Sequence, residues 1–152
     1  MPSASLVVER LHGREAVSAL FHFNVDCLST SAHLALKTLI GEEVSLRLLQ
    51  ADGSTRAWHG LVTRSANLGG DGALTRYRLT LQPWLALLGL RLDSFIFQDL
   101  SVLDIAAAIF ADYPQASFRI DAQPVPTRSL TIQYRETDLA FLSRLLAEEG
   151  LS

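Results

Sequence analysis

The first 84 residues contain short runs in which apolar and polar side chains alternate with a period of two. These runs lie at residues 21–27, 44–48, 58–62 and 76–82, and an Asp52-Gly53 pair separates the second run from the third. A period of two is typical of strands that bury one face, and glycine tolerates the backbone angles of a tight hairpin turn. The pattern therefore predicts antiparallel strands joined by hairpins. The expected buried faces hold Phe21, Phe23, Val25 and Cys27 in the first run and Tyr77, Leu79 and Leu81 in the last.

Helical signals dominate the remaining residues. Residues 102–109 carry an apolar stripe at helical spacing, and Ser101 with Asp104 has the spacing of a capping box. Residues 137–149 carry a second apolar stripe, which ends at Gly150. These patterns predict two amphipathic helices. Shorter elements are expected as helical turns at 34–39 and 83–88 and as strands at 117–121 and 129–134.

The order of the elements is a run of strands followed by helices mixed with short strands. This order predicts an α+β fold with an antiparallel β-barrel or sandwich at its front. We place a β-barrel domain at residues 1–90 and an α+β segment at residues 91–152, and no internal repeat is visible. The chain stops at Ser152, shortly after the last helix. We interpret it as an N-terminal fragment of a larger protein, with the second segment truncated before its closing strands.

Composition points to partners outside the chain. The sequence is 49% hydrophobic and 19% charged, with a mean hydropathy of +0.22, whereas roughly a quarter charged is usual. This surplus predicts apolar surfaces covered by other subunits or by further chain. Net charge is −3, Lys37 is the single lysine and the arginines are scattered, so no cationic cluster favours nucleic acid. No secretory signal and no membrane span are visible, which predicts folding in the cytoplasm.

Candidate catalytic side chains are few. His22 and Asp26 share the polar face of one predicted strand, and we interpret that face as solvated, with a catalytic pocket there as the alternative. Glu136 and Asp138 have the spacing of an acid/base couple. We interpret them instead as residues that cap the last helix and complement its dipole. Cys27 continues an apolar strand face and is expected to be a small core residue.

Metal and cofactor chemistry is not indicated. The histidines are isolated, and a single cysteine allows neither an intramolecular disulfide nor a cysteine-rich metal site. We therefore predict no catalytic, cofactor-binding or metal-binding residues. A small hydrolase using His22, Asp26 or Glu136 with Asp138 remains as a remote alternative. The histidines are His12, His22, His33 and His59.

One long segment and several shorter ones carry a family resemblance. The long segment is Gln133–Gly150 (QYRETDLAFLSRLLAEEG), and it closely resembles a signature of the VgrG family. These proteins are the spikes of type VI secretion and are similar to the hubs of contractile phage tails. The resemblance covers essentially the whole chain. Further segments fall in the family's order at Phe21–Val25, Gly60–Thr63, Tyr77–Leu88 and Ile96–Ile105.

The resemblance implies a structural component rather than an enzyme. It implies a phage-tail-hub-like β-barrel at residues 1–90 and a continuing hub segment at 91–152. The hub would trimerise, join the spike to the hexameric Hcp-type tube and the baseplate, and serve the delivery of effectors, with effector or adaptor proteins as further partners. Export would pass through the type VI apparatus to the extracellular space or a target cell. Leu20 departs from the proline common in the family, and the hub of a contractile phage tail is the alternative.

Overall fold

The computed structural model describes residues 5–151. The chain divides into two units, Met1–Pro83 and Trp84–Ser152, and each unit encloses its own core. The division falls at Pro83, earlier than the boundary expected at residue 90. The reason is that Trp84–Gly89 forms a 3-10 helix, η2, whose Leu88 is completely buried in the core of unit 2.

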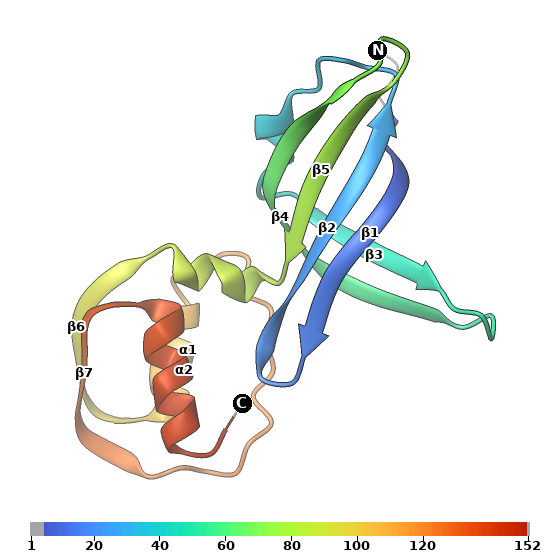
Figure 1. Ribbon diagram of the computed structural model, residues 1–152. Helices are drawn as coiled ribbons and strands as arrows, with labels where there is room; N and C mark the ends of the chain where they lie inside the picture. Colours follow the sequence, from blue (N-terminus) through green and yellow to red (C-terminus); the bar gives the residue numbers. More distant parts are fainter. Residues whose placement is uncertain (1–4, 152) are drawn as a thin grey trace. The chain divides into compact units, whose positions relative to one another are not determined.

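Unit 1 is built from antiparallel strands (Figure 1). Across the described residues its sheet has five strands in the order β1-β2-β5-β4-β3, and it forms an open half-barrel with β1 and β3 at the edges. A short 3-10 helix, η1 (Leu36–Leu39), precedes Gly41, whose φ is +89°. The predicted barrel-like antiparallel fold is thus confirmed. The strands are β1 (Val7–Ala16), β2 (Ala19–Ser29), β3 (Glu43–Leu49), β4 (Thr55–Gly70) and β5 (Thr75–Gln82).

The core of unit 1 lies on one face of β2 and β5, as the alternation predicts. Phe23 pairs with Leu81 and Cys27 pairs with Tyr77 in the antiparallel register. All four of these side chains are buried. Burial of a large apolar side chain contributes roughly 1.5–3 kcal/mol, so this face accounts for much of the unit's stability.

The opposite face of β2 differs from the prediction. Asp26 lies on the face expected to be solvated, yet only 4% of its surface is exposed. It stands directly across from Arg78 on β5, and the two side chains pair. Asn24 likewise accepts a hydrogen bond from the Thr80 hydroxyl at 2.9 Å. Paired polar side chains therefore cover this face.

A two-stranded arm extends beyond the rest of the sheet (Figure 1). We define the arm as residues 43–60, because β3 pairs with β4 from Glu43 to Leu49 while β5 pairs with β4 only from Leu61 onward. Gly60 lies at its root, where a Cβ atom would come within 2.3 Å of the Gln82 carbonyl oxygen. Trp58 anchors the root on Phe23 at a ring-centroid distance of 4.9 Å.

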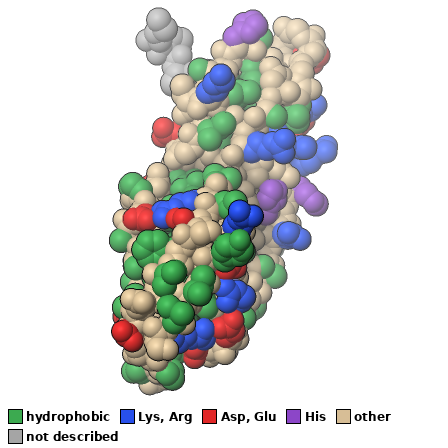
Figure 2. Space-filling model, turned by 90° about the vertical axis from the view of Figure 1, so that its left-hand side faces the viewer, with side chains coloured by type: hydrophobic (Ala, Val, Ile, Leu, Met, Phe, Trp, Pro, Cys, Tyr) green, Lys and Arg blue, Asp and Glu red, His purple; other side chains and the backbone are tan. Residues whose placement is uncertain are grey.

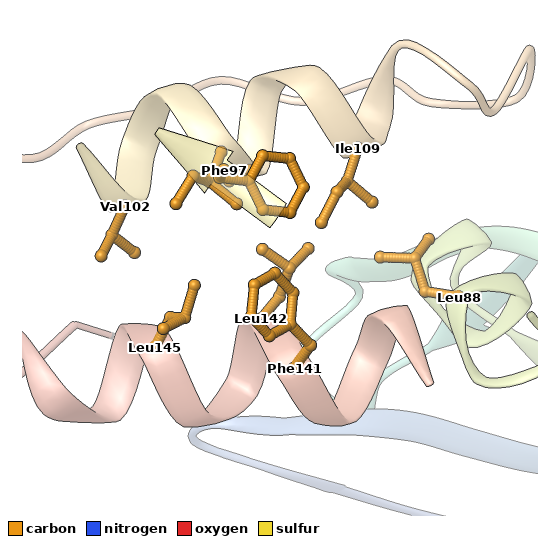
Figure 3. Packing of buried hydrophobic residues seen from close by; sticks show 9 residues of the cluster. Leu88, Phe97, Val102, Ile109, Phe141, Leu142 and Leu145 are labelled. Carbon is orange, nitrogen blue, oxygen red and sulfur yellow. The ribbon is translucent and has the colours of Figure 1, made fainter. Parts of the chain in front are cut away.

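Unit 2 packs two helices against one face of an antiparallel strand pair (Figure 3). Figure 3 shows the helix residues Val102, Ile109, Leu142 and Leu145 pointing toward one another around Phe97. These side chains belong to a single buried cluster. The elements are β6 (Leu92–Ser101), α1 (Val102–Phe110), β7 (Thr127–Thr137) and α2 (Asp138–Glu148).

Both predicted helices are confirmed, and one predicted strand is wrong. α1 begins with the expected capping box, in which the Ser101 hydroxyl accepts from the Asp104 amide and the Asp104 carboxylate accepts from the Ser101 amide. Residues 117–121, by contrast, are irregular. Their Phe118 ring packs on Phe110 at 4.7 Å, and the Trp84 indole donates to the Ser117 carbonyl. Aromatic packing takes the place of strand pairing there.

The structure reveals a repeat that the sequence does not show. Each half of unit 2 is a strand that runs directly into a helix with a Ser or Thr N-cap. In each half a non-glycine residue with positive φ, Asp99 or Arg135, stands two positions before the cap. Ile96 and Ile132 lie opposite each other at the centre of the strand pair. Equivalent buried helix positions are Val102 and Asp138, Ile105 and Phe141, Ala106 and Leu142, and Ile109 and Leu145.

Candidate functional site

The first pair of candidate residues, His22 and Asp26, does not form a catalytic arrangement. The Asp26 carboxylate accepts two hydrogen bonds from the Arg78 guanidinium, at 2.7 and 2.9 Å. This charge-assisted pair lowers the pKa of Asp26 below its ordinary value. His22 is half-buried and lies across from Arg14 on β1. Asp26 therefore serves as a fixed ion-pair partner.

Cys27 and the other histidines also lack a shared site. Cys27 is 3% exposed, as expected of a core residue, and burial raises the pKa of its thiol. His59 Nδ1 lies 2.8 Å from the Ser45 hydroxyl on the neighbouring strand of the arm. No group of three or more His, Cys, Asp or Glu side chains among residues 5–151 is arranged to hold a metal ion.

Glu136 and Asp138 bind different partners. The Glu136 carboxylate accepts from Arg144 at 2.6 Å, at the surface of α2. Asp138 is 1% exposed and accepts from the Tyr113 hydroxyl at 2.6 Å. Neither residue is the cap that the sequence suggests, because the Thr137 hydroxyl accepts from the Ala140 amide in that role.

Asp138 is the centre of a polar cluster in unit 2. Its second carboxylate oxygen accepts from the Gln133 amide at 2.8 Å, and its backbone amide donates to the Arg91 carbonyl at 3.1 Å. The Arg91 guanidinium binds Asp112 at 2.6 Å and Asp93 at 2.9 Å, and it lies 3.5 Å from Asp138. Desolvation and the bond to Asp138 raise the pKa of Tyr113 above its ordinary value. The polar cluster thus joins the start of β6, the end of α1 and the start of α2.

Comparison of the two halves of the repeat shows that apolar side chains can fill the positions of the polar cluster. Asp138 occupies the position equivalent to the apolar Val102, and Gln133 the position equivalent to Phe97. One half of unit 2 therefore uses apolar contacts where the other uses buried hydrogen bonds. Buried polar groups of this kind hold their partners in a defined geometry.

A cavity of about 320 Å³ opens beside the polar cluster. Its apolar wall comes from β6 and α1, and its polar wall from the cluster. The lining includes no histidine, cysteine, serine or lysine among the described residues. Both Asp138 oxygens already accept hydrogen bonds, so the cavity provides no free acid/base pair. The apolar wall consists of Phe95, Phe97, Ala108 and Ile109.

A more extensive candidate site is the outer face of β6 and β7. We use this name for the six side chains that point away from the helices, where Ile96 is 57% exposed and Tyr134 is 68% exposed. Figure 2 views the side of unit 2 on which β6 and β7 lie, and hydrophobic side chains are spread among charged ones there. A solvated antiparallel face is ordinarily polar. The outer face comprises Ser94, Ile96, Gln98, Leu130, Ile132 and Tyr134.

The sequence gives only part of the signal for this surface. The alternation in residues 129–134 leaves Leu130, Ile132 and Tyr134 on one side, which by itself predicts that this apolar side is the buried one. The structure shows the reverse, because the polar side with Thr131 and Gln133 is buried and the apolar side is exposed. The surplus hydrophobicity of the composition is thus visible as an exposed apolar surface.

Comparison with known proteins identifies the family. The model of the phage tail baseplate hub (GPD) family matches residues 14–152. The chain belongs to this family. The resemblance to VgrG proteins, based on the segment Gln133–Gly150, is confirmed by the relatives below.

Two curated relatives of this hub family member come from Pseudomonas aeruginosa. The type VI secretion system spike protein VgrG1a is 37% identical over 148 residues, covering 96% of this chain and 23% of its own length. VgrG1c, another spike protein of that system, is 38% identical over 148 residues, covering 96% of this chain and 20% of its own. The chain therefore spans about a quarter or less of the length of these relatives.

A solved structure has the same fold. The E. coli c3393 protein is a component of the type VI secretion system with structural similarity to the T4 bacteriophage tail proteins gp27 and gp5. It matches with a TM-score of 0.85 at 28% identity, covering 95% of this chain and 40% of its own. Among the described residues of the present hub domain, no helix has the length and apolar character needed to cross a membrane.

Proposed function

We propose that this chain forms the hub of a type VI secretion spike. In this role it trimerises and joins the spike to an Hcp-type tube and to the baseplate, so that effectors are delivered when the machine contracts. The observation that carries the proposal is the alignment of 96% of the chain with spike proteins at 37–38% identity. The protein would be made in the cytoplasm and exported through the type VI apparatus itself.

The distribution of side chains supports a structural role rather than catalysis. The carboxylates considered as catalytic residues are engaged in ion pairs or buried hydrogen bonds. Large apolar side chains are exposed on the outer face instead. An exposed apolar surface of this kind is typical of a protein that assembles. A hydrolase using His22 or Asp26 gains no support from this arrangement.

Multi-angle light scattering tests the assembly directly. We expect a particle with three times the 16.7 kDa mass of the chain, and we expect it to bind an immobilised hexameric Hcp-type tube protein. A monomer at all accessible concentrations would overturn trimerisation. A trimer that does not bind the tube protein would overturn the connecting role while leaving assembly intact.

The hub of a contractile phage tail is the second candidate. It is favoured by the description of the matching family as a phage tail baseplate hub. The two candidates differ in the tube that the hub contacts. Parallel binding measurements with an Hcp-type hexamer and with a phage tail-tube protein distinguish them, since preferential binding to the phage protein supports this second function.

A further inference from the structure

The arm of unit 1 carries exposed apolar side chains at its free end. Leu48 is 45% exposed and Leu49 is 72% exposed, and these two neighbours point to opposite faces of the ribbon. A two-stranded ribbon without further packing is only marginally stable in water. The arm is held at its root by Trp58. Its end therefore gains stability if another surface covers it.

The outer face of β6 and β7 has matching chemistry. It carries four large apolar side chains and no charged one. Its five-residue stretch from Ser94 to Gln98 spans roughly 16 Å, and the seven-residue strand of the arm spans roughly 23 Å. The arm is therefore long enough to lie across the whole face.

Charge favours contact between different surfaces over contact between identical ones. Unit 2 contains five arginines against nine acidic residues, a net charge of −4, whereas unit 1 contains eight basic against seven acidic residues, a net charge of +1. Two copies joined through their outer faces would bring two negatively charged units together. The arm itself is formally neutral, with Arg47 and Arg56 against Glu43 and Asp52. An arm that belongs to the positive unit therefore meets no net repulsion on unit 2, whereas a second outer face would.

We infer that the arm of one copy packs on the outer face of β6 and β7 of the next copy. This inference rests on the proposed hub function and assigns the surfaces that join its subunits. The contact is head-to-tail, because donor and acceptor are different surfaces. Contacts of this type form a ring when the rotation between copies closes, whereas a self-complementary face gives two-fold dimers. The proposed trimer therefore needs only this one contact, repeated three times.

Disulfide trapping between two variants, each with one added cysteine, tests the contact. Leu49→Cys lies on the arm and Gln98→Cys on the outer face, and the native Cys27 is buried. One variant carries a size tag, so that a mixed product is identified on a non-reducing gel. We expect a mixed disulfide when the two variants are combined under mild oxidation. The parent protein, with Cys27 alone, should give none.

The matched control is Val17→Cys, at a position that is 93% exposed and outside both surfaces. Cross-linking of Gln98→Cys to Val17→Cys as efficiently as to Leu49→Cys would overturn the contact. Preferential cross-linking of Gln98→Cys to itself would show face-to-face packing and would also overturn it. A trimer in light scattering without the mixed disulfide rejects this contact but keeps the hub function. A monomer without the disulfide rejects both.

A charge substitution provides a second measurement. Ile132→Lys places a charge at the centre of the outer face, and we expect it to weaken association by about tenfold or more. Leu90→Lys changes a side chain that is 83% exposed in the same unit but outside that face, and it should leave association unchanged. Both positions are exposed, so circular dichroism should show an intact fold. Equal association constants for the two variants would contradict the inference.

Discussion

At the scale of single residues, Asp138 connects several parts of unit 2. Its carboxylate holds Tyr113 and Gln133, and its amide donates to the Arg91 carbonyl. We expect Asp138→Ala to lower the free energy of unfolding by about 3 kcal/mol, because the buried Gln133 and the half-buried Tyr113 both lose their acceptor. Urea denaturation measures the change.

The control for Asp138 is Glu136→Ala. Glu136 pairs with Arg144 at the surface, and pairs of this kind contribute about 1 kcal/mol or less. If Glu136→Ala lowers the free energy of unfolding as much as Asp138→Ala does, the burial and hydrogen bonding of Asp138 make no extra contribution to stability.

The Asp26–Arg78 pair makes the free energy of unfolding depend on pH in the acidic range. The pair lowers the pKa of Asp26 in the folded state, so its contribution is complete above the unfolded pKa. That contribution is lost as the pH falls below about 4. We expect Asp26→Asn to reduce the difference in unfolding free energy between pH 7 and pH 3. Asp121→Asn, which removes a pair whose side chains are 86% exposed, should leave that difference unchanged. A wild-type pH profile for Asp26→Asn would refute the role of the pair.

Sequence reasoning could identify these residues but not their partners. The alternation placed Asp26 on the polar face of its strand, and Arg78 lies 52 positions away. Tyr113 lies 25 positions from Asp138, on the turn after α1. These polar side chains are buried because such distant partners bind them, and neither hydrophobic periodicity nor capping preference identifies those partners. Local sequence patterns therefore predict a solvated face at Asp26 and an acidic helix cap at Asp138, whereas contacts with distant residues bury both side chains.

At the scale of elements, local signals locate the helix ends well. The Ser101 side chain accepts from the Asp104 amide, and the Asp104 carboxylate completes the capping box. We expect Ser101→Ala to lower the free energy of unfolding by about 1 kcal/mol, through the loss of this cap. Ser143→Ala, at an exposed position inside α2, is the matched control. It should be neutral or slightly stabilising, because alanine has the higher helix propensity. Urea denaturation of both variants provides the comparison.

Strands are predictable only where one face is buried. β2 and β5 alternate clearly, whereas β1 is exposed along almost its whole length and offers no alternation. Phe118 and Ile120 alternate as a strand would, yet Phe118 packs on aromatic rings instead. The repeat in unit 2 is invisible in the sequence because equivalent positions hold unlike residues, such as Val102 and Asp138. Backbone geometry preserves the repeat where side-chain chemistry does not.

At the scale of the whole molecule, apolar side chains serve both folding and assembly. Each unit encloses its own buried cluster, while further large apolar side chains stay exposed on the arm and on the outer face. The composition alone predicts that surplus, but it cannot locate it. The positions of the exposed apolar side chains follow from the pairing of the strands. Among the described residues no third strand pairs with the arm, and the helices cover only one face of β6 and β7, so apolar positions on both surfaces lack neighbours.

Separate cores predict separate unfolding, and the two tryptophans can report it. Trp58 lies in unit 1 and Trp84 in unit 2. Trp84→Phe leaves Trp58 as the fluorescent reporter of unit 1, and Trp58→Phe leaves Trp84 as that of unit 2. Because each unit has its own core, we expect Asp26→Asn to shift only the Trp58 urea midpoint and Asp138→Ala only the Trp84 midpoint. Each single-tryptophan protein without the second substitution is the control. If either substitution moves both midpoints by the same amount, the two units unfold as one cooperative structure.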